Sequence, residues 1–176
     1  MSRLESGIER LRVWDSALCI RFNGAVRIAP VRAVFRVVSR LGDGVFWYSL
    51  MLALLAVGGG SALAPIGRMA GTGLACTLVY KWLKSKTSRP RPFAVENAVR
   101  AGADPLDPFS FPSGHTLHAV AFSIVAIAFY PMLAWLLVPF TLLVAASRVV
   151  LGLHYPSDVL AGAGLGALIA SAFLAL

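Results

Sequence analysis

The stretch TLHAVAFSIVAIAFYPMLAWLLVPFTLLVAAS, residues 116–147, contains no Asp, Glu, Lys or Arg, and it decides the class of fold. Two further stretches, 44–67 and 159–176, are also free of charged side chains. The hydrocarbon core of a bilayer is about 30 Å thick, and a helix needs about 20 apolar residues to cross it. These stretches supply that length. They predict an all-α fold, a polytopic membrane helical bundle.

The composition agrees with a membrane location. Of the 176 residues, 58% are hydrophobic and 14% are charged, whereas soluble domains carry about 25% charged residues. The net charge of +8 would also suit a nucleic-acid-binding protein. The basic residues lie at the edges of the apolar stretches, however, where lipid headgroups and membrane topology explain them. We therefore expect the lipid bilayer, and no nucleic acid, as the partner.

The uncharged stretches divide into about five transmembrane helices. We expect them at about 44–57, 63–83, the two halves of 116–147, and 158–176. The turns between neighbouring helices are indicated at Gly58–Gly60 and at Tyr130–Pro131. In the last helix, the three alternate glycines of 162–166 allow a neighbouring helix to pack closely.

The N-terminal segment, residues 1–42, mixes eight arginines with apolar side chains. Such a segment cannot span a bilayer, but it suits an amphipathic structure lying on the membrane surface. Pro30 is expected to break it into two helices. We therefore divide the chain into an amphipathic interfacial segment, 1–42, and a transmembrane domain, 43–176.

Five crossings in alternating directions bring the polar parts of the chain to one side of the membrane. The N-terminal segment, the 84–112 loop and the 148–158 loop then share one face. Three polar clusters meet on that face, and they are Lys84–Pro92, Phe111–Thr116 and Ser147–Asp158.

The clusters contain the groups of an oxyanion site. Lys84, Arg91 and Arg148 are three cations, and the planar guanidinium of arginine binds phosphate oxygens in a bidentate manner. The apolar run after Ser113 indicates a helix start with Ser113 near the N-cap. The free amide of Gly114 would then point toward an anion, and a glycine lets the backbone come close to it.

Two histidines can supply the chemistry. His154 and Asp158 are four residues apart, so Asp158 can accept the Nδ1 proton of His154 and leave Nε2 free to attack phosphorus. His115 begins another helix on the same face, where it can protonate the leaving lipid oxygen and then activate water. The cations would neutralise the phosphoryl oxygens, which is most of what phosphoryl transfer needs. The pattern predicts a phosphatase with a phosphohistidine intermediate.

The three motifs resemble the signature of the type 2 phosphatidic acid phosphatase superfamily. They are Lys84-x6-Arg91-Pro92, Pro112-Ser113-Gly114-His115 and Ser147-Arg148-x5-His154-x3-Asp158. The resemblance implies a lipid phosphate phosphatase that uses no metal ion or other cofactor. It implies His154 as the nucleophile, His115 as the acid and base, and Asp158 as the residue that orients His154. The phosphate binders that it implies are Lys84, Arg91, Ser113, Gly114 and Arg148.

Polar residues beside the motifs have plainer interpretations. His118, one turn after His115, is expected to pack or to support the site. The basic side chains that flank the first motif are expected to anchor the chain at the membrane interface; they are Lys81, Lys86 and Arg89.

Four further acidic residues lie on the face that carries the three polar clusters, which we call the active face. Asp43 lies between two glycines, where it can cap the first span or help to shape the site. Glu96, Asp104 and Asp107 belong to the loop over the site, and the sequence assigns them no chemistry.

The substrate is expected to be amphiphilic, because the site lies at the membrane surface between helices. Phosphatidate or phosphatidylglycerophosphate is the first expectation, and undecaprenyl pyrophosphate or another polyprenyl phosphate is the alternative. More distant alternatives are a vanadium haloperoxidase and a non-catalytic lipid-binding membrane protein.

The distribution of basic residues predicts the orientation. The active face carries the N-terminal arginines and several further basic residues, whereas the opposite face carries only Arg68. Positive charge near short loops favours the cytoplasmic side. We therefore expect a multi-pass protein of the inner cell membrane whose site opens to the cytoplasm.

Overall fold

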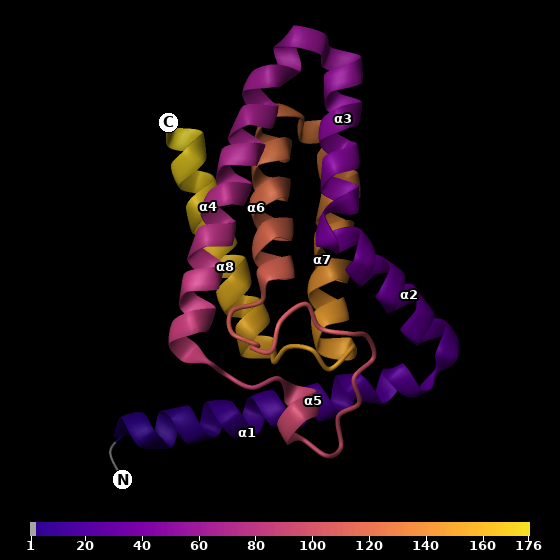
Figure 1. Cartoon of the computed structure of the whole chain (residues 1–176), viewed down its shortest axis with the longest axis vertical. Helices are drawn as coiled ribbons and strands as arrows, with labels where there is room; N and C mark the ends of the chain where they lie inside the picture. The colour runs from indigo at the N-terminus through magenta and orange to yellow at the C-terminus, as the bar shows by residue number, and fades with distance from the viewer. Residues whose placement is uncertain (1–2) are drawn as a thin grey trace.

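The chain forms a bundle of five helices, with one helix across its end and a second that rises from there to the bundle (Figure 1). This computed structural model describes residues 3–176, apart from the side chains of residues 3–5 and 8. Residues 1–2 of the predicted interfacial segment lie outside the described residues. The bundle consists of α3 (Phe46–Gly58), α4 (Leu63–Thr87), α6 (Gly114–Phe129), α7 (Ala134–Val150) and α8 (Pro156–Ala175). No strand occurs among the described residues, and the predicted all-α fold is confirmed.

The bundle is suited to a membrane. Three helical runs are long and apolar enough to cross a bilayer, and they are Ala29–Thr87, Pro131–Val150 and Pro156–Ala175. The first run contains both α3 and α4, which turn back on each other at η3 (Gly59–Ala62), at the top of Figure 1. Large apolar side chains such as Leu78, Trp135 and Leu168 are exposed on the outside, where lipid tails would surround them.

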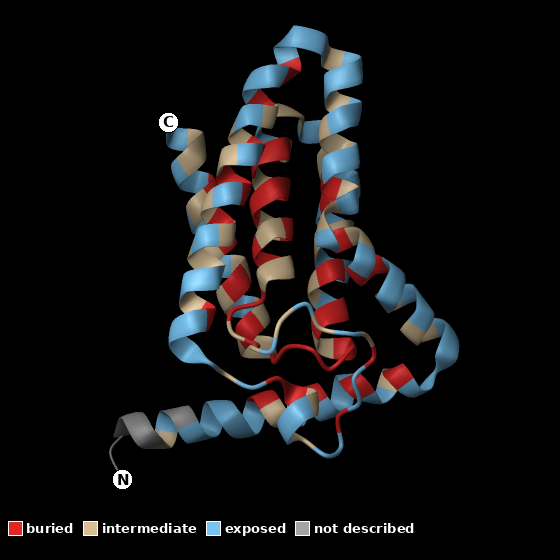
Figure 2. Cartoon of the chain, in the orientation of Figure 1, coloured by how far each residue is buried: buried red, intermediate tan, exposed pale blue. Residues whose placement is uncertain are grey.

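Helix α6 is the centre of the bundle. It packs against α8, α4 and α7, and Figure 2 shows buried residues along much of its length. α8 crosses it closely, because a Cβ on Gly162 would lie 2.6 Å from the carbonyl oxygen of Ser113 and one on Gly166 would lie 2.4 Å from that of Leu117. Small residues allow this approach. The crossing holds the starts of α6 and α8, and therefore two of the motifs, next to each other.

Three boundaries differ from the sequence-based expectation. α4 runs one turn further than expected, so Lys84 lies in its last turn, and Arg148 lies in the last turn of α7. The break in the surface segment falls at η1 (Gly24–Arg27), and not at Pro30. Pro30 instead begins α2 (Ala29–Arg40), because the first-turn amides of a helix need no intrahelical acceptor and proline lacks the amide hydrogen.

Helix α1 (Arg3–Asn23) is tied to both loops of the active face. It lies across the end of the bundle, where the 88–113 loop with the short α5 (Pro92–Val95) overlaps it in the view of Figure 1. The Asn23 side chain donates hydrogen bonds of 2.9 Å to the carbonyl oxygens of Arg100 and Val150. The N-terminal segment and the two loops therefore share one face, as the alternation of crossings predicts.

The glycine crossing gives a test of the packing. We expect Gly166→Ala to destabilise the protein by about 1–3 kcal/mol, because its methyl group would overlap the Leu117 carbonyl. The change should lower the melting temperature in detergent. Gly164→Ala is the matched control, since a Cβ at Gly164 meets nothing within 4 Å. Equal melting temperatures for the two variants would contradict the close crossing.

Candidate active site

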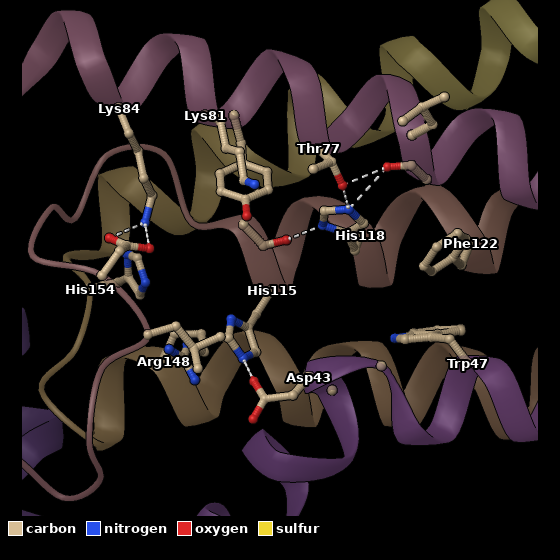
Figure 3. Close-up of a pocket in the computed structure, with 18 of the residues that line it drawn as sticks. Asp43, Trp47, Thr77, Lys81, Lys84, His115, His118, Phe122, Arg148 and His154 are labelled. Carbon is tan, nitrogen blue, oxygen red and sulfur yellow. Dashed lines mark hydrogen bonds and ion pairs between the residues drawn. The ribbon is translucent and has the colours of Figure 1, made fainter.

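A cavity of about 800 Å³ lies on the loop side of the bundle, where α4 and α7 end and α6 begins. Figure 3 shows Lys84, His115, Arg148 and His154 gathered around its polar end. Its other walls are Trp47 and further apolar or aromatic side chains of α3, α4 and α6; they include Tyr48, Met51, Leu74 and Phe122. The cavity therefore joins a charged end to an apolar channel between the helices.

Three cations form the charged end. Lys84 comes from α4, Arg91 from the loop after it and Arg148 from α7, and all three line the cavity. Their exposed fractions are only 7%, 2% and 2%. Burying cations is costly unless anions or polar groups compensate them, so their convergence indicates a site for an anion. The predicted set of phosphate-binding cations is brought together.

The start of α6 faces the same cavity. Gly114 lines it, next to the Tyr80 ring. Ser113 is the N-cap residue, but its side chain makes no capping bond. The hydroxyl group is fully buried and pairs with Thr116 at 3.0 Å. The Ser113 side chain does not line the cavity, whereas the other predicted phosphate binders, Gly114 and the three cations, do.

His154 lies in the loop between α7 and α8, with 1% of its surface exposed, and lines the cavity. Its Nε2 is 3.2 Å from Nη1 of Arg91. Its Nδ1 is 3.7 Å from Oδ2 of Asp158, which is longer than a hydrogen bond. The predicted hydrogen bond between the two side chains is not formed, and Oδ2 of Asp158 instead accepts the Tyr155 amide at 2.9 Å.

The protonation state of His154 suits a nucleophile. Burial lowers its pKa well below the ordinary value, and the neighbouring charges of Arg148, Arg91 and Lys84 lower it further. The imidazole is therefore neutral at physiological pH and keeps a free electron pair on one nitrogen.

Arg89 has a structural role that the sequence did not reveal. It was expected to be an interface anchor, but it bonds Asp158 at 2.7 Å and Asp15 of α1 at 2.8 Å. Its guanidinium also lies over the Tyr155 ring, 4.1 Å from the centroid. Arg89 thus holds the carboxylate of Asp158 between α1 and the start of α8.

The two histidines of α6 have different surroundings. Nε2 of His115 contacts Oδ1 of Asp43, from the turn before α3 (Figure 3). His118 has hydrogen bonds from Nδ1 to the Gly114 carbonyl at 2.8 Å and from Nε2 to the Thr77 hydroxyl at 3.1 Å. His118 is therefore a hydrogen-bonded supporting residue, as expected.

Asp107 is one of the three loop residues to which the sequence assigned no chemistry. Its carboxylate oxygens lie 2.8 and 2.7 Å from Nζ of Lys84, and one lies 3.1 Å from Nη2 of Arg91. Burial raises the pKa of Asp107, but the hydrogen bond and the charge of Lys84 outweigh that effect and leave it below the ordinary value. The only sequence signal was its position five residues before the Pro112–His115 motif.

The site contains cations and no metal cluster. Among the residues that the structure describes, no group of three or more His, Cys, Asp and Glu side chains could hold a metal ion. Charge on a bound anion would be neutralised by Lys84, Arg91 and Arg148 themselves.

Two solved structures share the arrangement of helices. The transmembrane PAP2 type phosphatidylglycerolphosphate phosphatase from Bacillus subtilis aligns with a TM-score of 0.74, over 94% of this chain and 85% of its own, at 24% identity. Aquifex aeolicus LpxE aligns with a TM-score of 0.81, over 93% of this chain and 96% of its own, also at 24% identity. These likenesses establish the fold.

Two curated proteins are similar in sequence. Undecaprenyl-diphosphatase BcrC of Bacillus subtilis (strain 168) is 38% identical over 92 residues, which are 51% of this chain and 46% of that protein. The bacitracin transport permease protein BcrC of Bacillus licheniformis is 36% identical over 91 residues, 52% of this chain and 45% of that protein. The chain thus spans about half the length of the curated relatives that it matches.

The family model of the PAP2 superfamily matches residues 63–176. This match begins with α4 and includes all three motifs, from Lys84 to Asp158. The chain belongs to the PAP2 superfamily.

Proposed function

We propose that this protein is an integral membrane phosphatase that hydrolyses the phosphomonoester or diphosphate of a membrane lipid. The observation that carries the proposal is the single cavity in which three buried cations surround His154, while apolar side chains continue the cavity between α3 and α4. A phosphorylated lipid has the matching polarity, with a charged head and an apolar tail.

The reaction follows from the placement of the groups. Nε2 of His154 attacks phosphorus, so that a P–N bond forms and the P–O bond to the lipid breaks. His115 gives a proton to the leaving oxygen, and it then takes a proton from the water that hydrolyses the phosphohistidine. The cations stabilise the phosphoryl oxygens in both steps. The carboxylate of Asp158 lies near Nδ1 and stabilises the ring as it becomes positive.

Two lipid classes fit the cavity. A polyprenyl diphosphate is favoured by the curated relative named as an undecaprenyl-diphosphatase, and by Lys81, which lines the cavity beside Lys84 and would face a second phosphate. A phosphatidate or phosphatidylglycerophosphate is the other class, in line with the name of one solved structure of the same fold.

A substrate panel tests the proposal. We expect purified protein in detergent to release phosphate from undecaprenyl diphosphate, undecaprenyl phosphate, phosphatidate or phosphatidylglycerophosphate, and EDTA should leave the rate unchanged. His154→Ala should lower kcat by a factor on the order of 10³ or more, because the nucleophile is lost. The specificity constants rank the lipids.

Two controls sharpen this test. Lys86→Ala removes an exposed cation of the same helix outside the cavity, and it should leave kcat unchanged. Rapid quenching should trap an acid-labile phosphoenzyme in the wild type and none in His154→Ala. Normal turnover by His154→Ala would overturn the assignment.

Asp107 would compete with the substrate for two of the cations. Its carboxylate binds Lys84 and Arg91, and both cations carry the proposed phosphate contacts. A phosphate group brings more charge and more acceptor oxygens than a carboxylate, so it can displace Asp107 when it binds. The cost of that displacement weakens substrate binding.

We therefore expect Asp107→Asn to lower both the KM of the lipid phosphate and the inhibition constant of inorganic phosphate, by about tenfold each. Steady-state kinetics with product inhibition measures both constants. The control is Asp104→Asn, which removes an exposed charge from the same loop and should change neither. A raised KM in Asp107→Asn would instead make Asp107 a residue that holds the cations in place.

The membrane orientation is part of the proposal. We infer that the protein lies in the inner membrane of a bacterium, that residues 1–42 lie along the membrane surface, and that the cavity opens to the cytoplasm. The support is the concentration of basic side chains on the loop face, since positive residues near short loops favour that side.

Single cysteines at the two ends of the bundle report this orientation. Ala101 and Gly60 are exposed on the loop face and at the α3–α4 turn, whereas the native Cys19 and Cys76 are buried. A membrane-impermeant maleimide should label Gly60→Cys in intact spheroplasts, but Ala101→Cys only after lysis. Labelling of Ala101→Cys alone in intact spheroplasts would place the site on the outer side.

A further inference from the structure

His115 contacts Asp43, a residue that belongs to none of the three motifs. Asp43 lies in the turn η2 (Leu41–Val45) between α2 and α3, and its Oδ1 is hydrogen-bonded to Nε2 of His115. Figure 3 shows the two side chains pointing at each other across the cavity. The family match begins at residue 63, so this carboxylate comes from outside the matched region.

The local sequence brings the turn close to His115. Gly42 is buried, and a Cβ there would lie 3.3 Å from the methyl groups of Val144 and 3.6 Å from Cδ2 of His115. Gly44 has a φ of 131°, a conformation that residues with a side chain rarely adopt. The two glycines therefore let the backbone approach α6 and α7 and then enter α3, with the Asp43 side chain directed at the ring.

The charges around His115 make this carboxylate important. The neighbours of the ring include the cation Arg148 from α7 and two histidines, His118 of α6 and His154 of the loop after α7. None of these three groups carries a negative charge. Asp43 is the acidic group that contacts His115, whereas Asp107, which lines the same cavity, binds Lys84 and Arg91. A proton donor must carry its proton before the reaction, and beside Arg148 an imidazolium is unfavourable without a compensating anion.

We propose that Asp43 is the positioning residue of His115. By holding Nε2, Asp43 orients the ring so that Nδ1 faces the leaving oxygen, and its negative charge stabilises the protonated ring. The Nδ1 proton passes to the oxygen as the P–O bond breaks, and Nδ1 takes a proton back from water as the P–N bond is hydrolysed. The site then has two histidine–carboxylate pairs, Asp158 with His154 and Asp43 with His115. This inference rests on the proposed phosphatase function.

Leaving groups of different basicity test the proposal. A lipid alkoxide needs a proton in order to leave, whereas the nitrophenolate of p-nitrophenyl phosphate leaves without one. We expect Asp43→Asn to lower kcat by about 10²-fold with the lipid phosphate, but only a few-fold with p-nitrophenyl phosphate. His115→Ala should show the same pattern with a larger effect. Asp43→Glu keeps the carboxylate and should recover part of the lost rate on the lipid.

The control is Glu9→Gln, which removes an exposed carboxylate of α1 that does not line the cavity and should change neither rate. Equal losses on both substrates in Asp43→Asn would overturn the proposal, as would an unchanged rate on the lipid. If Asp43→Asn does not fold, Asp43→Glu gives the same comparison, with a smaller loss that is again confined to the lipid. A wild-type protein without phosphatase activity would refute the proposed function itself. If His115→Ala loses activity mainly on the lipid while Asp43→Asn keeps the wild-type rate, only this inference is refuted.

Discussion

Three buried cations at one end of a membrane bundle are the constraint on which the rest of the structure depends. Lys84, Arg91 and Arg148 are almost fully enclosed, and each would be costly there without a partner. The structure meets this cost with oxygen atoms: Arg91 bonds the carbonyl oxygens of Asp107 and Leu153, and Lys84 bonds that of Phe109. The Asp107 carboxylate completes the set for Lys84 and Arg91, whereas Nε of Arg148 is buried without a hydrogen-bond partner. A site built in this way favours an anion that can replace the carboxylate.

The bundle exists in this form because α8 can approach α6. Gly162 and Gly166 leave room for the α6 backbone, and the crossing places the starts of both helices at one end. His115 begins one of these helices, and the His154–Asp158 pair precedes and begins the other. The ion pairs of Arg89 with Asp158 and with Asp15 then fasten α1 to the same end. Packing deep in the bundle thus determines the geometry of groups at its surface.

The N-terminal segment contributes to the site although the family match does not include it. Asp15 and Asn23 of α1 hold the two loops, and Asp43 reaches His115 from the turn before α3. The Ser39 hydroxyl of α2 also accepts a hydrogen bond from Arg148. The division at residue 42, which charge patterning suggests, therefore separates Asp15, Asn23 and Ser39 from the residues that they bind in the folded chain. Gly42, the last residue of the segment, lines the cavity.

The sequence by itself determined the class of fold, the approximate helices and the three motifs, because apolar length and short spacings are local properties of the chain. His154 and Asp158 lie within one turn of each other, and the start of α6 follows from its own residues. The tertiary structure decided the partners of Asp43, Asp107 and Arg89, which are 72, 23 and 69 residues away along the chain. It also turned the Ser113 hydroxyl toward Thr116 instead of the cavity. Such contacts depend on how helices cross and how loops fold back, and no local pattern of charge or hydrophobicity encodes them.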